Sequence, residues 1–194
     1  STHCCIHREQ LAVKRMPDQL KTVMNDSIKI VNLIKARPLN SRIFTALCEE
    51  MGSNHSKLLL HTEVRWLSRG KVLNRIFELR DEVRLYLLNS NHELANRMLD
   101  FSWLAQLAFL ADVFNILNAL NLALQGKSLT IFILHDKIKA LRAKLVIWYS
   151  RLDRLEFDSF TLLQSFLFSS DPMMCNRFAA VCVVNTTGCP PLML

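Results

Sequence analysis

Residues 64–71 combine side chains that can hold a nucleic acid: one large aromatic ring among several cations. Trp66 lies beside Arg65, and Arg69 and Lys71 follow within five residues. An indole ring can stack on an extruded base while neighbouring cations contact phosphates. A large aromatic residue next to charges is more often a core anchor beside a solvated rim. The local pattern therefore predicts a candidate nucleic-acid site and leaves the core alternative open.

Cysteine and histidine residues near the start of the chain have a spacing that can begin a metal site. Cys4 and His7 form a C-x-x-H pair next to His3. Structural zinc needs four ligands, and no second pair follows at the spacing of a zinc finger. A Cys–His nucleophile pair also lacks an Asn or Asp that the sequence singles out as its orienting partner. We therefore predict no metal site, no cofactor and no catalytic residue.

The remaining chemistry-bearing residues form no motif of an independent active site. The chain has no glycine-rich phosphate loop, no HExxH helix and no serine-nucleophile elbow. Cys175, Cys182 and Cys189 near the end of the chain are not paired as CxxC. Scattered cysteines of this kind suit a reducing intracellular compartment.

The composition predicts a mainly helical bundle. Apolar residues make up 51% of the 194 residues, which is enough for one sizeable core. Only four glycines and five prolines leave few turns for an all-β fold. The 24 Lys and Arg residues outnumber the 17 Asp and Glu residues, and the net charge of +7 is compatible with a polyanionic partner. No secretory signal is visible at the N-terminus.

Helical periodicity predicts the elements that would position these residues. Pro17 suits the first turn of a helix that Pro38 stops. A second helix is expected to start from an Asn40 or Ser41 cap and to end at Gly52. The segment at 2–13 is a loop or a short strand.

Further helices are expected in the second half of the chain. Ser68 is expected to cap a long helix that runs to about 88. Another helix starts near 91, bends near 100 and runs to 125, and helices follow at 130–153 and 159–168. The helix at 130–153 carries a packing seam at spacings of three and four, formed by Ile138, Leu141, Leu145, Trp148 and Leu152.

The stretch at 101–124 is apolar enough to raise the question of a membrane span. A row of polar residues interrupts it at intervals of three, which the core of a bilayer would penalise. We therefore predict a bundle helix with one polar stripe and no membrane contact. The row consists of Gln106, Asp112, Asn115, Asn118 and Asn121.

The composition changes after Phe168, where cysteine and proline become frequent. We expect three parts: residues 1–13, a helical domain at 14–168, and a divergent, poorly ordered tail at 169–194.

Several motifs together resemble a known superfamily. The stretch at 59–73 reads LLHTEVRWLSRGKVL and is followed by FELR at 77–80; with the C-x-x-H of Cys4 and His7 it resembles the hAT (hobo/Activator/Tam3) transposases. The segments IVNLIKARPL, LCEEMG and LNLALQGK elsewhere in the chain are similar as well. More narrowly, residues 2–168 resemble host proteins derived from such transposases, the BED-finger and FAM200-like group.

The resemblance implies a fragment of a larger protein. In these transposases an RNase H-like core carries an Asp, Asp and Glu triad that binds two divalent metal ions for strand cleavage, and a large helical domain is inserted before the last acid. By this resemblance, residues 1–13 are a remnant of that core and 14–168 are the insertion domain. The triad and the N-terminal BED zinc finger then fall outside the chain, so we expect no enzyme activity.

The resemblance also assigns roles to single residues. Trp66 matches the tryptophan that stacks on an extruded base, and Cys4 and His7 match a pair beside the active site. We expect a non-catalytic nuclear protein with weak DNA binding through Trp66, Arg65, Arg69, Lys71, Cys4 and His7. The alternative is a helical protein–protein interaction module without DNA binding, which uses the polar-striped helix at 103–125 and the seam at 138–152. No small-molecule substrate is expected.

Overall fold

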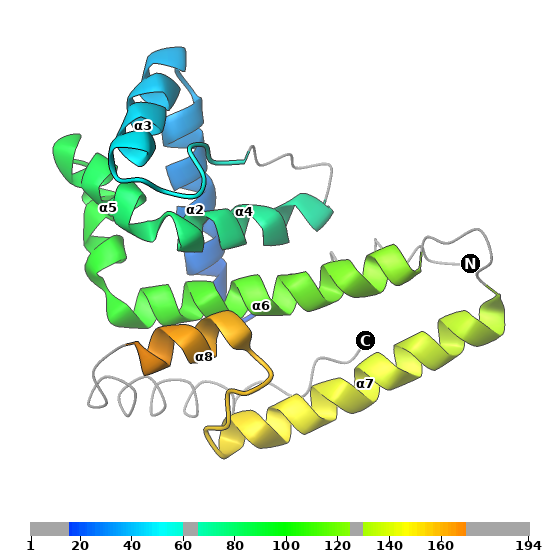
Figure 1. Cartoon of the computed structure of the whole chain (residues 1–194). Helices are drawn as coiled ribbons and strands as arrows, with labels where there is room; N and C mark the ends of the chain where they lie inside the picture. The colour runs from blue at the N-terminus through cyan, green and yellow to red at the C-terminus, as the bar shows by residue number, and fades with distance from the viewer. Residues whose placement is uncertain (1–15, 60–65, 125–129, 170–194) are drawn as a thin grey trace.

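The computed structural model describes residues 16–59, 66–124 and 130–169, and Figure 1 shows their arrangement. Helices are the only regular elements in these segments, which confirms the predicted mainly helical bundle. The expected N-terminal strand, the C-x-x-H pair and the tail lie outside the described residues. The elements are α2 (Asp18–Lys35), α3 (Pro38–Glu50), α4 (Trp66–Glu78), α5 (Arg80–Asn89), the 3-10 helix η1 (Glu93–Leu99), α6 (Phe101–Ala123), α7 (Ile131–Asp153) and α8 (Thr161–Phe168).

Helix α6 is the centre of the fold. By length and apolar composition it could cross a membrane. In the structure α2, α4, η1 and α8 pack around it, which is the position of a core helix (Figure 1). Asp100 caps its first turn by accepting a hydrogen bond from the amide of Ser102 at 2.9 Å. The buried face of α6 includes Trp103, Leu107 and Phe114.

The polar row of α6 serves contacts within the domain. Asp112 is buried, and its carboxylate accepts hydrogen bonds from the first turn of α8. Asn115 donates to the side chain of Asn74 on α4 at 3.0 Å, and Asn121 is also buried. Each of these groups would be costly to bury without a partner. The row therefore connects α6 to its neighbours within the domain.

The junction of α2 and α3 differs from the expected one. Helix α3 begins at Pro38 and not after an Asn40 or Ser41 cap, because proline is well tolerated at the first helical position. Asn40 and Ser41 instead donate to the carbonyls of Leu33 and Ile34 at 3.0 Å each. The last carbonyls of a helix lack intrahelical partners, so these two side chains close the end of α2. The expected end of α3 is confirmed: Gly52 follows its C-cap with φ +69°.

The expected long helix from Ser68 to about 88 is two helices. Helix α4 begins at Trp66, so Ser68 is its third residue and not its cap. Leu79, with φ −97° and ψ 27°, separates α4 from α5. The break places Leu79 in the core, where it is 2% exposed, and it sets Glu82 beside Ser53. Tertiary packing here overrides a helical pattern that continues through the sequence.

Helix α7 runs antiparallel to α6 and lies apart from the other described helices (Figure 1). Its aromatic link to the core is Trp148, whose ring centroid lies 5.7 Å from that of Phe160. The ring centroid of Phe160 in turn lies 5.0 Å from that of Phe109 on α6. The predicted seam is partly confirmed, since Leu141 is buried and Trp148 packs against the core while Ile138 remains 38% exposed.

Candidate functional site

The first turns of α4 hold half of the predicted nucleic-acid cluster. Trp66, Arg69 and Lys71 are residues one, four and six of this helix. Amide groups in the first turn of a helix have no intrahelical acceptor, so an anion is stabilised there. The side chain of Lys71 is exposed and forms no ion pair with a described acidic residue. Arg65, Cys4 and His7 lie outside the described residues, and the side chains of Trp66 and Arg69 are not described.

Gly70 fixes where this end of α4 rests on α6. A Cβ atom at Gly70 would lie 2.5 Å from the Asn118 Nδ2 atom and 3.0 Å from the Phe114 Cβ atom. Only glycine therefore permits this close approach of the two helices. One turn later, Asn115 donates its hydrogen bond to Asn74. The glycine contact and the amide pair together set the position of α4 along α6.

The register of α4 places Lys71 beside the helix face that contacts α6. Trp66 precedes Gly70 by four residues and Leu73 by seven, which is the spacing of a single helix face. Gly70 and Leu73 face α6 and are buried. Lys71 is offset by about 100° from Gly70 and is solvent-accessible. Lys71 thus lies beside the α4–α6 contact.

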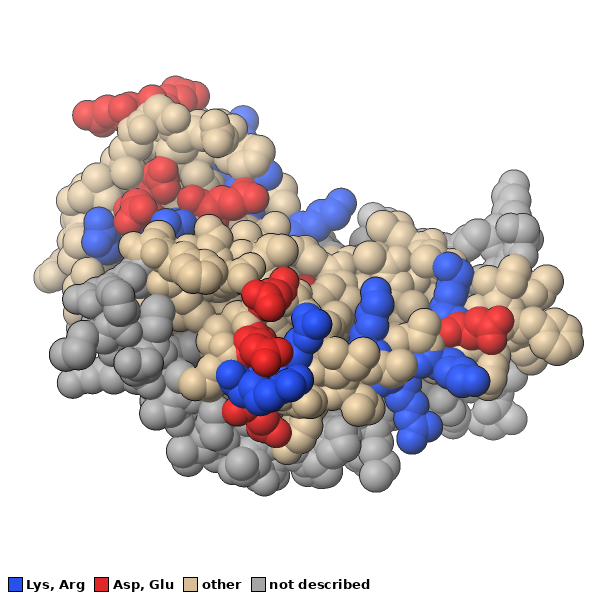
Figure 2. Space-filling model, turned by 60° about the horizontal axis from the view of Figure 1, so that its bottom comes forward, with Lys and Arg blue, Asp and Glu red and all other residues tan. Residues whose placement is uncertain are grey.

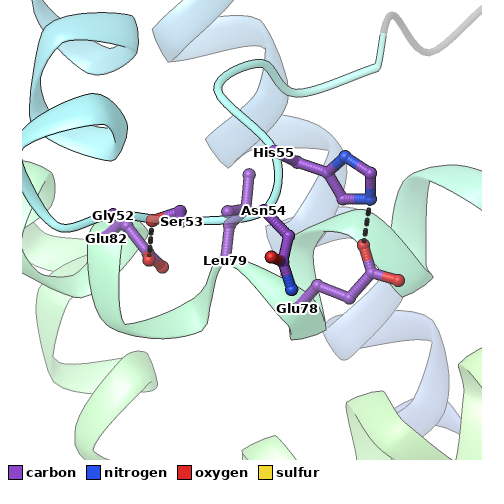
Figure 3. Close-up of a pocket in the computed structure, with 7 residues that line it drawn as sticks. All are labelled: Gly52, Ser53, Asn54, His55, Glu78, Leu79 and Glu82. Carbon is purple, nitrogen blue, oxygen red and sulfur yellow. Dashed lines mark hydrogen bonds and ion pairs between the residues drawn. The ribbon is translucent and has the colours of Figure 1, made fainter.

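A shallow hollow forms where the connector after α3 crosses the junction of α4 and α5 (Figure 3). The Ser53 hydroxyl donates to the buried Glu82 carboxylate. The His55 Nε2 atom lies 3.6 Å from Glu78 Oε2. Serine, histidine and a carboxylate can form a nucleophilic relay only when they contact one another in sequence. Here Ser53 and His55 each pair with a different glutamate, so the hollow anchors the connector and holds no relay.

The described residues contain no cluster of three metal-ligating side chains. Cys48, the one cysteine among them, is a buried free thiol. Burial, together with the nearby carboxylates of Glu82 and Glu49, raises the pKa of Cys48 from 9.0 to about 11. A thiol in this state is a poor nucleophile and a poor metal ligand.

The outward face of α7 is a surface that the sequence reasoning missed. It leaves large apolar side chains in water, including Phe132 at 78% exposed and Ile147 at 51%. Lysine and arginine side chains gather over this helix, with uncharged surface between them and acidic side chains at both ends of the group (Figure 2). The sequence signal was present: between 137 and 152 there are five cations and no acidic residue, namely Lys137, Lys139, Arg142, Lys144 and Arg151. The predicted packing seam lies on a different stripe of this helix.

Comparison with protein families identifies the domain. Residues 3–153 match the model of the FAM200/GTF2IRD2 helical domain. The chain belongs to the FAM200/GTF2IRD2-like family. The predicted kinship with transposase-derived proteins is confirmed at this level. No solved structure matches the chain.

In this FAM200/GTF2IRD2-like domain the family match and the core have different limits. The match ends at Asp153, the last residue of α7. Helix α8 follows it and buries Leu163 and Leu167 against the same core. The match also spans both surfaces described above, the start of α4 and the outward face of α7. These two surfaces are the candidates for contact with other molecules.

Proposed function

We propose that this domain is a non-catalytic module of a nuclear, transposase-derived protein, and that it contacts DNA through the start of α4. The observation that carries the proposal is the concentration of cations at one helix end. Arg65, Arg69 and Lys71 fall within seven residues, and Gly70 holds that end of α4 against α6. A fixed helix N-terminus with adjacent cations suits a phosphate group.

The proposed contact has an electrostatic part and a stacking part. The three cations pair with backbone phosphates, which gives affinity without sequence preference. Trp66 stacks on an unpaired base, as the family resemblance implies. Cys4 and His7 lie beside the bound DNA in the same proposal. Single-stranded or hairpin DNA is therefore the preferred ligand.

We propose no strand cleavage by this chain. Two-metal hydrolysis needs a full set of carboxylates to hold the ions. The resemblance assigns none of the three triad acids to residues of this chain. The proposed role is thus binding, with no reaction at the phosphodiester.

DNA titration of the full 194-residue chain tests the proposal. The variant Arg65→Ala/Arg69→Ala/Lys71→Ala should weaken hairpin binding and reduce the slope of log affinity against log salt by about 0.7 to 0.9 per lost phosphate contact. The control Arg37→Ala/Arg42→Ala/Lys57→Ala removes three exposed cations elsewhere and should keep the wild-type slope. If both variants lose DNA affinity equally, the effect comes from net charge alone, which would contradict the proposal.

The variant Trp66→Ala separates stacking from packing. Under the proposal it weakens binding to hairpin DNA by about 1 to 3 kcal/mol while the melting temperature stays close to that of the wild type. Unchanged affinity combined with a large loss of stability would place Trp66 in the core, where its register with Gly70 and Leu73 also fits.

Protein binding through α7 is the second candidate function. Its specific support is the exposure of Ile131 at 74%, Phe132 at 78% and Val146 at 59% on one helix. Large apolar side chains gathered on a surface mark interaction sites more often than scattered ones do.

A further inference from the structure

The outward face of α7 carries a heptad pattern. Ile133, Ala140, Ala143 and Ile147 follow one another at spacings of seven, three and four residues. All four are exposed, with Ile133 at 42% and Ile147 at 51%. This spacing is that of the seam along which one helix packs against another. The stripe lies opposite the seam that faces the core, so α7 has two packing faces and only one is occupied by described residues.

Cations line both flanks of this exposed stripe. Lys137, Lys144 and Arg151 recur every seven residues along one flank, and Lys139 lies on the other. These are the positions beside a helix seam whose charges select the partner. Of the acidic residues on α7, Asp153 follows the run of cations, whereas Asp136 directly precedes Lys137 and lies on the stripe between Ile133 and Ala140. From 137 to 151 the two flanks thus carry four cations and no acidic residue.

We propose that the outward face of α7 binds an acidic amphipathic helix of another protein. The partner's apolar residues cover the stripe, and its Asp and Glu residues pair with the cations of the two flanks. The alanines at 140 and 143 allow the two helices to approach closely. This inference rests on the protein-binding function and is independent of DNA binding at α4.

A second copy of α7 does not meet this requirement. An antiparallel pair would place Lys137, Lys144 and Arg151 opposite the same flank of its partner, and like charges in these positions repel. The other parts of the chain are no more suitable. Residues 1–15 carry three cations and one acid, and residues 170–194 carry one of each. None of these segments supplies an acidic helix for this face, and the proposal assigns that helix to another protein.

Nucleic acid is a less suitable ligand for this face. Phosphates would engage the flanking cations, but the central stripe of aliphatic side chains offers no base stacking. A protein helix satisfies both features at once, because it buries the stripe and neutralises the flanks.

Two synthetic peptides test the proposal against the full chain. Both are three-heptad amphipathic helices with the same leucine seam; one carries glutamate at the flanking positions and the other carries lysine. We expect the glutamate peptide to bind at least about tenfold more tightly than the lysine peptide in fluorescence anisotropy, with an affinity that falls as salt rises. The variant Lys139→Glu/Lys144→Glu should reverse this order of affinity. The control Arg42→Glu/Lys57→Glu changes the net charge equally on exposed residues elsewhere and should preserve it.

A stripe variant reports on the apolar part of the contact. Ala143→Asp should abolish binding of the glutamate peptide while circular dichroism and the melting temperature remain those of the wild type, since Ala143 is exposed. If the two peptides bind equally and Ala143→Asp abolishes both, α7 binds proteins but the acidic partner class is wrong. If neither peptide binds, the protein-binding function of α7 fails as well.

Two further outcomes would replace the proposed occupant. A dimer in multi-angle light scattering that Ile147→Glu dissociates would identify a second copy as the occupant. A loss of duplex DNA binding in Lys139→Glu/Lys144→Glu, without any peptide binding, would identify nucleic acid. Either result overturns the proposal.

Discussion

The carboxylate of Asp112 on α6 accepts a hydrogen bond from the backbone amide of Leu163 on α8, 51 residues away, at 3.1 Å. The amide of Leu162 donates to the same carboxylate at 3.0 Å. Phe160, at the N-cap position of α8, offers no side-chain oxygen for these amides. Asp112 therefore acts as the cap of a helix that is distant in sequence. The Asp112 carboxylate thus fixes the first turn of α8 against α6.

Replacing Asp112 should destabilise the domain more than a typical surface substitution. Asp112→Ala leaves the first amides of α8 without an acceptor in a buried place, so we expect a loss of about 2 to 3 kcal/mol in the free energy of unfolding. Asp112→Asn keeps one acceptor oxygen and should lose less. Urea denaturation followed by circular dichroism measures both; equal losses would show that the capping oxygen is irrelevant.

Asp112 should also make stability depend on pH. Burial raises the pKa of Asp112 above its ordinary value of 3.8, although the amides of Leu163 and Leu162 and the hydroxyl of Thr161 oppose the rise. A raised pKa means that the folded state binds the proton more readily than the unfolded chain. The stabilising contribution of the protonated group is therefore lost as pH rises through the raised pKa. Relative to Asp112→Asn, the wild type should lose stability as pH rises from about 4 through the raised pKa of Asp112. Profiles of stability against pH that run parallel in the two proteins would contradict this.

Gly70→Ala should destabilise the domain despite the better helix propensity of alanine. The propensity gain is about 1 kcal/mol, whereas overpacking costs about 1 to 3 kcal/mol. The Phe114 backbone carbon, 3.3 Å from the added Cβ, cannot move as freely as the Asn118 amide can. We expect a smaller loss in an Asn118→Ala background, and chemical denaturation of the double-mutant cycle measures that coupling.

Gly52→Ala provides the contrast for this steric effect. A Cβ atom at Gly52 would meet nothing within 4 Å, but φ is +69°. Its cost should come from the backbone alone, about 1 kcal/mol, and should not depend on Asn118.

Cys48 should react slowly in the folded protein. Raising the thiol pKa from 9.0 to about 11 lowers the thiolate fraction at neutral pH about 100-fold. Because the unfolded thiol ionises first, stability should fall as pH rises from about 9 towards 11. Mass spectrometry of iodoacetamide labelling at Cys48 checks the rate, and Glu82→Gln should increase it by removing one neighbouring charge. A native rate equal to that in urea would show that the thiol is open to solvent.

Trp148→Ala should loosen α7 without unfolding the core. The substitution removes the ring contact with Phe160, the aromatic link between α7 and the core. We expect faster tryptic cleavage between 137 and 144, with a smaller loss of stability than Asp112→Ala causes. Tyr149→Ala is the matched control, because Tyr149 is 36% exposed and has no ring contact with the described residues. Equal cleavage of the two variants would show that Trp148 does not anchor α7.

Local signals predicted much of this fold. Pro17 and Pro38 bracket α2 as expected, and Gly52 ends α3. The helix predicted at 130–153 from its regular apolar spacing runs from Ile131 to Asp153. These features depend on neighbouring residues only, so a single sequence contains them.

Features that depend on distant residues were not predictable in the same way. No proline or glycine marks the break between α4 and α5 at Leu79. The break accompanies the burial of Leu79 and the hydrogen bond between Glu82 and Ser53. The sequence predicts the polar row of α6 as a stripe on one helix face. It does not identify the hydrogen-bond partners of that row on α4 and α8, which lie 41 to 51 residues away. Of the predicted binding cluster, the exposed Lys71 is the one side chain that the structure describes.

The position of α8 has a practical consequence for whoever expresses this domain. Its family-matched segment stops at 153, yet Phe160, Leu163 and Leu167 beyond it are 1%, 0% and 6% exposed. A truncation at that limit would remove α8 and expose the apolar surface of α6 that it covers. The Asp112 carboxylate on that surface would lose its hydrogen-bond donors. We expect such a truncated product to aggregate on expression. Extending it by the sixteen residues 154–169, which lie beyond the family match, should prevent this.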